Sequence, residues 1–267
     1  MKLLSDPDRL GNGRNLLGIA AVFFALTACQ NPMKDVKTYD ISIPLVAGEG
    51  RASAWYVPPI SIEPVRANGF VGSVAEGGSV NFRDITFNPH GHGTHTECLG
   101  HITETVHSIN SVNIPWLMPC ELITVTPREI EGGDRVIDET MLALATDAPP
   151  VALVIRTLPN ELEKQVRNWS NTNPPYLTAE AAKWLVAKGV EHLLLDLPSV
   201  DREVDGGALT AHHVFWGVPE APRMGATITE LVYVKDEIPD GRYDLNLQTA
   251  PFVNDATPSR PLLIRRN

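Results

Sequence analysis

Two apolar runs decide the fold class of this 267-residue chain: Val151-Ala-Leu-Val-Ile-Arg-Thr157 and His192-Leu-Leu-Leu-Asp-Leu197. The first is continuously apolar over its first five residues, as a strand buried on both faces would be, and the second, with three consecutive leucines, is predicted to be another buried strand. Between them, Thr178 is a favourable N-cap for a helix over 179–188. Because strand, helix and strand follow one another over 151–197, the sequence predicts an α/β domain with a mixed β-sheet.

The flanking sequence extends this alternation in both directions. A β-branched run over 121–126 predicts a strand, and acids followed by good helix formers over 138–146 predict a short helix. A further apolar run predicts a strand over 227–234, whereas prolines and glycines over 38–75 indicate short strands and loops. The predicted domain covers 38–267.

Composition excludes two broad classes of protein. Hydrophobic residues make up 43% of the chain and charged residues 20%. Because this hydrophobic fraction is large enough to build a core, a generally disordered chain is excluded. Lys and Arg number 22 against 32 Asp and Glu, for a net charge of −10. A protein that binds nucleic acid needs a basic face, so no nucleic-acid partner is expected.

The N-terminal residues are typical of a targeting segment. The apolar run over 16–28 is shorter than the roughly 20 residues of a membrane-spanning helix, and it follows basic residues, as in a secretory signal. It ends in Leu26-Thr27-Ala28-Cys29, which resembles the lipobox of bacterial lipoproteins. This resemblance implies a signal peptide (1–28), acylation of Cys29, a tether (29–37) and a lipid-anchored protein of the bacterial cell envelope, on the periplasmic or outer-membrane side. The alternative is a buried N-terminal helix.

Two cysteines remain beyond the leader, Cys98 and Cys120. Spacing alone does not decide whether they form a disulfide in an oxidising compartment. Free cysteines are among the most buried residue types, and we predict two unpaired, buried thiols.

One short segment carries most of the candidate chemistry, His90-Gly-His-Gly-Thr-His-Thr-Glu-Cys-Leu-Gly-His101. Imidazoles and a carboxylate are suitable ligands for zinc, manganese or iron. In an extended chain His95 and Glu97 point the same way, and a helical turn after Glu97 would bring His101 to the same side. The segment therefore predicts a metal centre; the alternative is a solvated, histidine-rich loop.

The stretch Gly93-Thr-His-Thr-Glu-Cys-Leu-Gly-His101 resembles the signature of the cyclase family of metal-dependent hydrolases, His-x-Gly-Thr-His-x-Asp-x-x-x-His. That family includes bacterial kynurenine formamidase and isatin hydrolase. The likeness continues in family order through Val154-Ile-Arg-Thr157, Tyr176 to Leu185, Asp196-Leu-Pro-Ser-Val-Asp201, His212-His-Val-Phe-Trp-Gly217 and Ile228-Thr-Glu-Leu231. It covers about 40–250 and implies a swivelling β/β/α domain.

The resemblance also implies roles for individual residues. The positions that match the family's metal ligands are His95, Glu97, His212 and Glu230, and the position that matches its general acid/base is His101. Glu97 stands where the family usually has aspartate. Apart from the resemblance, Asp196 and Asp201 are predicted to have turn and capping roles; the alternative is that they position loops near the site.

This chain departs from the family pattern at two places. The first signature histidine falls on Gly91, so that His90 or His92 replaces it or the site has one ligand fewer; we predict His90. The segment before Glu230 is longer than usual, which leaves His213 as an alternative to His212; we predict His212.

The function implied is a metal-dependent hydrolase that cleaves an amide, cyclic amide or lactone with metal-activated water, similar to an arylformamidase (kynurenine formamidase). The cofactor expected is one or two divalent ions, zinc or manganese. We expect a small-molecule substrate and contact with the membrane through the lipid anchor alone. The sequence leaves both a monomer and a homo-oligomer open. The alternative is a catalytically inactive lipoprotein that binds a small ligand on the same fold.

Overall fold

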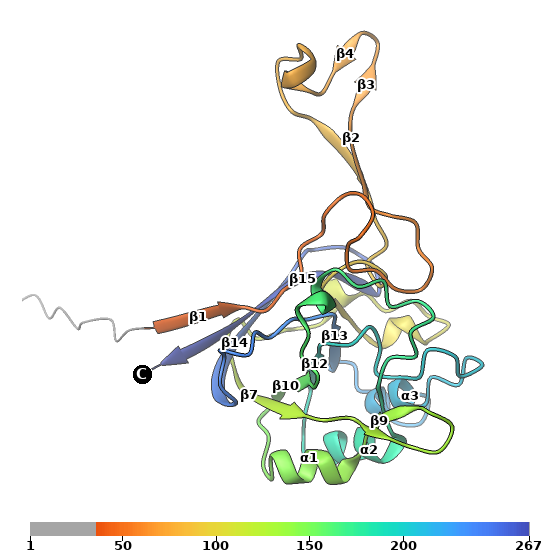
Figure 1. Cartoon of the computed structure of the whole chain (residues 1–267), viewed down its shortest axis with the longest axis vertical. Helices are drawn as coiled ribbons and strands as arrows, with labels where there is room; N and C mark the ends of the chain where they lie inside the picture. The colour runs from red at the N-terminus through yellow and green to blue at the C-terminus, as the bar shows by residue number, and fades with distance from the viewer. Residues whose placement is uncertain (1–35, 267) are drawn as a thin grey trace, which may run out of the picture. The chain divides into compact units, whose positions relative to one another are not determined.

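The computed structural model describes residues 36–266, which form a mixed α/β fold around one eight-stranded sheet (Figure 1). In spatial order its strands are β1 (Val36–Asp40), β15 (Ala256–Arg266), β14 (Gly241–Thr249), β7 (Met118–Val125), β10 (Ala152–Thr157), β12 (His192–Leu195), β13 (Thr227–Glu230) and β6 (His95–Glu97). Because β6 also pairs with β15, seven strands close into a ring and β1 is added at β15. Strands β7, β10, β12 and β13 are parallel, whereas β14, β15 and β6 pair antiparallel.

Three helices and several smaller elements complete the described chain. The helices are α1 (Glu139–Ala145), α2 (Ala179–Ala187) and α3 (Thr210–Trp216). The short strands are β2 (Ser61–Pro64), β3 (Arg66–Ala67), β4 (Phe70–Val71), β5 (Arg83–Thr86), β8 (Arg128–Glu129), β9 (Arg135–Ile137) and β11 (Tyr176–Leu177). Single 3₁₀ turns are η1 (Val74–Glu76), η2 (Leu99–His101), η3 (Ile109–Ser111) and η4 (Leu162–Gln165). The predicted helices over 138–146 and 179–188 are confirmed as α1 and α2, and the predicted βαβ unit as β10, α2 and the parallel strand β12.

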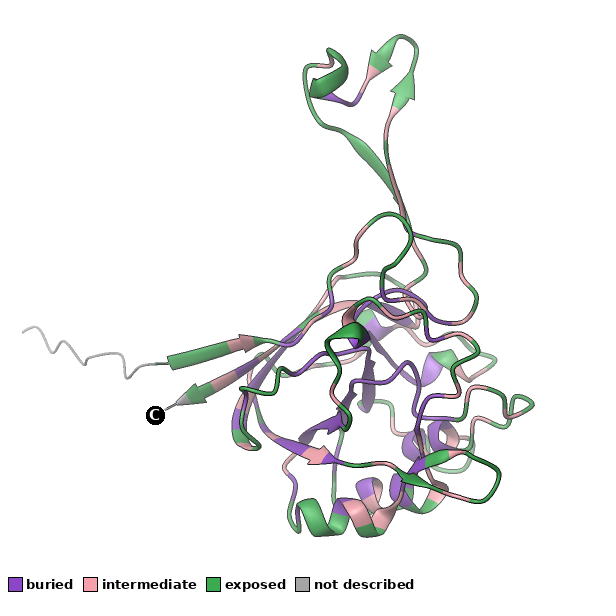
Figure 2. Ribbon diagram, viewed as in Figure 1, coloured by how far each residue is buried: buried purple, intermediate pink, exposed green. Residues whose placement is uncertain are grey.

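The strand β10 is buried on both faces, as its continuous apolar run predicts. Leu153 and Ile155 lie in a cluster with residues of all three helices. Ala152 and Val154 lie in a second cluster, built mainly from other strands of the ring. Figure 2 shows buried residues along the central strands, while β2 to β5 are mainly exposed. The central parallel strands thus form a rigid support for the loops at their ends.

Helix α2 begins as its sequence predicts. The Thr178 side-chain hydroxyl accepts a hydrogen bond from the backbone N–H of Ala181, which satisfies one of the helix's free N-terminal donors. We expect Thr178→Ala to lower the free energy of unfolding by about 1 kcal/mol. Urea unfolding measures this loss, with Thr178→Ser as the control that keeps the hydroxyl. An alanine variant as stable as the parent protein would contradict the capping role.

In the C-terminal region one prediction needs correction and two strands were missed. The strand predicted over 227–234 ends at Glu230, because Leu231 has a left-handed backbone (φ 54°) that interrupts extended structure. The long strands β14 and β15 were not predicted. β15 contains Pro258 and Pro261, and proline is unusual inside a sheet because it lacks the N–H donor.

The predicted signal peptide (1–28), Cys29 and most of the predicted tether lie outside the described residues; Val36 and Lys37, the last two tether residues, belong to β1. Among the described residues, no helix has both the length and the apolar character needed to cross a membrane. Cys98 and Cys120 are buried free thiols, which confirms the prediction that they are unpaired.

Candidate active site

The short strand β6 and the turn that follows it present three of the predicted site residues. His95 and Glu97 alternate along β6 and are both buried, and Gly93 allows the entry turn with a left-handed backbone (φ 59°). After β6 the chain enters η2, which brings His101 Nδ1 to 3.9 Å from Glu97 Oε2. The local spacing in the sequence therefore predicts the arrangement of this part of the site.

Two further predicted residues reach the same space from elsewhere in the fold. Glu230 ends β13 and pairs in register with His95, so that His95 Nε2 lies 3.4 Å from Glu230 Oε2. His212, on α3, places Nε2 3.1 Å from Glu97 Oε1 and 3.9 Å from Glu230 Oε1. The structure thus brings together residues that lie more than a hundred positions apart in the chain.

A buried carboxylate holds His212 in this orientation. Asp201 Oδ2 lies 2.6 Å from His212 Nδ1, and the same carboxylate accepts backbone N–H groups of Ala211 and His212 at the start of α3. The predicted capping role of Asp201 therefore agrees with the structure, but the contact with the His212 ring was not predicted. A carboxylate on one ring nitrogen fixes the tautomer and leaves the other nitrogen as an acceptor.

The structure places His90 in the cluster. His90 Nδ1 lies 3.0 Å from Glu97 Oε2. The side-chain oxygen of Asn88 accepts from the backbone N–H of His90 and of Gly91, which fixes the turn that carries the ring. Gly91 is required here, because a Cβ at this position would lie 2.7 Å from the Val57 side chain. In a regular strand His90 would point away from the side of His95. The backbone turn held by Asn88 directs it towards Glu97 instead.

The two alternative histidines point elsewhere. His92 Nδ1 accepts from the Asn88 backbone N–H, and its Nε2 lies 3.0 Å from the Pro58 carbonyl oxygen. His213 Nδ1 lies 3.2 Å from the Val218 carbonyl oxygen. Both rings therefore bond to the backbone outside the cluster, so His90 and His212 are the members of each pair that face Glu97.

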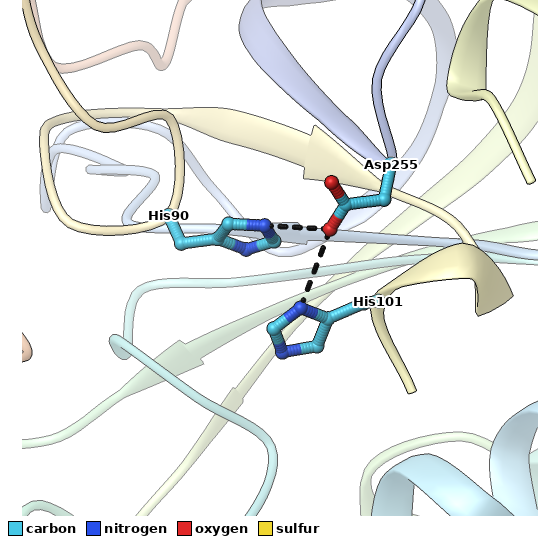
Figure 3. A group of neighbouring side chains, drawn as sticks. All are labelled: His90, His101 and Asp255. Atoms are coloured by element: carbon cyan, nitrogen blue, oxygen red, sulfur yellow. Dashed lines mark hydrogen bonds and ion pairs between the residues drawn. The ribbon is translucent and has the colours of Figure 1, made fainter. Parts of the chain in front are cut away.

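One residue of the cluster was not predicted from the sequence. Asp255 Oδ2 lies 2.8 Å from His90 Nε2 and 3.4 Å from His101 Nδ1 (Figure 3). Asp255 comes directly before β15, where Ala256 pairs with Glu97. A lone aspartate outside any motif gives no sequence signal, and only the pairing of β15 with β6 brings it here.

The electrostatics of the cluster favour positive charge. Burial acts to raise the pKa of Glu97, but the neighbouring imidazoles outweigh it and hold this pKa well below its usual range. Burial, together with the Glu97 charge, raises the pKa of Glu230. Burial acts to lower the pKa of His212, yet contacts with Asp201 and Glu97 raise it to about 10. Positive charge is therefore stabilised here, whether carried by an imidazolium or by a metal ion.

Three buried atoms in the cluster form no hydrogen bond: His95 Nε2, Glu97 Oε2 and Glu230 Oε1. A buried polar atom without a partner is unfavourable, and these are the atom types that bind divalent metals. Nitrogen and oxygen atoms that share a metal at about 2.0–2.2 Å lie roughly 3 to 4 Å apart. The separation of His90 Nδ1 from Glu97 Oε2 is 3.0 Å and that of His95 Nε2 from Glu230 Oε2 is 3.4 Å, which agrees with this range. The described residues therefore fit a metal ion bound among His90, His95, Glu97, His212 and Glu230.

A cavity of about 340 Å³ opens beside the cluster. Trp55, Val57 and Leu209 contribute apolar walls, and His101 and Glu230 are among its polar lining residues. The His101 side chain is 31% exposed, in contrast to the fully buried His95 ring. An apolar pocket with a few convergent polar groups is the usual form of a small-molecule site.

This chain is similar to several known proteins. Kynurenine formamidase of Bordetella petrii is 27% identical over 186 residues, which cover 69% of this chain and 80% of the relative. The kynurenine formamidase of Bordetella avium is 28% identical over the same shares. A protein of Bacillus stearothermophilus described as a predicted metal-dependent hydrolase is a structural neighbour with a TM-score of 0.60 and 20% identity, covering 86% of this chain and 98% of that chain.

Isatin hydrolase A of Labrenzia aggregata has a TM-score of 0.62 at 14% identity, covering 87% of this chain and 94% of that chain. At such identities the structural likeness establishes the fold, which confirms the predicted α/β class with a mixed sheet. The Cyclase family model matches residues 39–202. Since this match spans more than half of the chain, and the site residues lie together as described, the chain belongs to the Cyclase family.

Proposed function

We propose that this protein is a metal-dependent hydrolase that cleaves a carbon–nitrogen bond of an amide or cyclic amide, with an arylformamidase-like specificity. The observation that carries the proposal is a set of three buried ligand atoms without a hydrogen-bond partner, on His95, Glu97 and Glu230, beside a cavity that Glu230 lines. The names of the relatives support the same class of reaction. Zinc and manganese suit a site of imidazoles and carboxylates.

A bound divalent metal supplies Lewis acidity, which polarises a carbonyl oxygen and lowers the pKa of water. The chain's own residues provide proton transfer. His101 Nδ1 faces Asp255, and the other ring nitrogen points away from that carboxylate (Figure 3). His101 lines the cavity, and this position supports a role in which it takes a proton from the attacking water and returns it to the leaving amine.

The cavity walls support an aromatic substrate. Trp55, Val57 and Leu209 offer apolar surface on which an aryl ring can pack. His101 and Glu230 line the same cavity, which supports a substrate that has an apolar ring for these walls and a polar reacting group for these two side chains. An N-formyl arylamine has this combination of an apolar ring and a small polar reacting group.

The test is hydrolysis by purified protein after removal of metal with a chelator. We expect no turnover without metal, and recovery on adding zinc or manganese, with one or two equivalents bound. N-formyl arylamines, isatin and a lactone serve as substrates, and absorbance follows each reaction. The comparison between substrates measures whether carbon–nitrogen bonds are preferred.

Two outcomes would contradict the proposal in different ways. A protein that binds neither metal has no metal centre. A protein that binds metal but hydrolyses none of the substrates would instead fit the alternative of an inactive lipoprotein that binds a small ligand.

A further inference from the structure

Asp255 occupies a position set by the sheet rather than by its own sequence. It precedes β15, and Ala256 pairs with Glu97 across to β6. The Asp255 carbonyl oxygen accepts a hydrogen bond from the backbone N–H of Cys98 at 3.0 Å. The backbone of Asp255 is thus fixed beside the end of β6 whatever its side chain, so a substitution at this position tests the carboxylate alone.

The carboxylate uses one oxygen for two rings. Asp255 Oδ2 lies 2.8 Å from His90 Nε2 and 3.4 Å from His101 Nδ1. The two rings are stacked, with centroids 4.2 Å apart and an interplanar angle of 29°. The Asp255 side chain is 17% exposed, so solvent competes weakly for these contacts. In Figure 3 both dashed lines meet at this single atom.

The contact determines which nitrogen of His90 faces the cluster. When the neutral His90 ring donates Nε2–H to Asp255, its Nδ1 carries no proton and lies 3.0 Å from Glu97 Oε2. Without a bound metal, these two atoms form an ion pair only when the ring is protonated at both nitrogens. A neutral ring nitrogen aimed at a carboxylate is unfavourable unless a cation lies between them.

We propose that Asp255 is a positioning residue that selects the Nε2–H tautomer of His90 and turns its Nδ1 towards the metal site. The inference rests on the proposed function, since it assigns a role towards the metal. Asp255 acts on His90 as Asp201 acts on His212: each carboxylate holds one ring nitrogen, and the other nitrogen faces Glu97. The contact with His101 holds a second ring in the same array.

The test compares Asp255→Ala with Asp255→Asn. One accepting oxygen serves both rings, so the asparagine carbonyl oxygen can replace Oδ2, whereas alanine offers no acceptor. Competition with a chromophoric chelator measures zinc affinity. We expect the alanine variant to bind zinc about 10- to 100-fold more weakly and the asparagine variant within roughly threefold of the parent protein.

His90→Ala and the double variant with Asp255→Ala complete the cycle. If Asp255 acts through His90, the double variant binds zinc no more weakly than His90→Ala alone. Once the His90 ring is absent, removing the Asp255 carboxylate has no further effect on zinc affinity. The unfolding midpoint of each metal-free variant shows whether the fold is retained.

Each other outcome has a separate meaning. If the parent protein binds no zinc, the proposed function fails. If the parent protein binds zinc and Asp255→Ala binds it equally well, the positioning role is wrong while the metal site stands. The positioning role is also overturned if Asp255→Asn is as weak as the alanine variant, since charge would then matter, or if the losses of His90→Ala and Asp255→Ala add.

Discussion

Purified His95→Ala is expected to contain no tightly bound metal. The His95 ring is fully buried, its Nε2 has no hydrogen-bond partner, and that atom lies 3.4 Å from Glu230 Oε2. Loss of a carboxylate that only orients a ligand costs about 10- to 100-fold in affinity, so loss of a ligand itself should exceed roughly 100-fold. Metal analysis after dialysis, followed by zinc titration, measures the change.

His213→Ala is the matched control for this experiment. It removes an imidazole next to His212, but one whose Nδ1 faces the Val218 carbonyl oxygen outside the cluster. We expect it to keep its metal. Full retention of zinc by His95→Ala would refute the ligand assignment, and loss of zinc from both variants would point to a general loss of fold, which circular dichroism would reveal.

His101→Ala should lower kcat by about 10²- to 10⁴-fold while the metal content stays at the parent level. The reason is position: His101 lines the cavity, its side chain is 31% exposed, and one of its nitrogens points away from Asp255. Steady-state hydrolysis of an N-formyl arylamine by the zinc-loaded variant gives kcat and KM separately. We expect KM to change little, because proton transfer is needed in the transition state more than in binding.

His107→Ala provides the comparison, since this nearby histidine does not line the cavity and its backbone, not its ring, contacts Cys98. Its kcat should equal that of the parent protein. If His101→Ala loses its metal, His101 is a ligand and not the proton-transfer residue. An unchanged kcat in His101→Ala would show that water or another group moves the proton.

Local patterns in the sequence predicted the frame of this protein. The apolar runs that became β10 and β12 are visible in the sequence as consecutive apolar residues, and Thr178 marks the start of α2 by a hydrogen bond within one turn. His95 and Glu97 share a side because side chains alternate along a strand. Each of these features depends on neighbours a few residues away, so sequence spacing is sufficient to predict it.

Only the tertiary structure determined how the site is completed. The choice of His90 over His92 depends on the Asn88 turn, and the presence of Asp255 depends on the pairing of Ala256 with Glu97. Strand register of this kind results from many weak pairings over the whole sheet. β15 also contains two prolines, which argue against a strand when only the sequence is considered. The sequence alone therefore determined the chemistry available and its local geometry, whereas long-range pairing determined which side chains meet, because contacts between distant segments have no local signature.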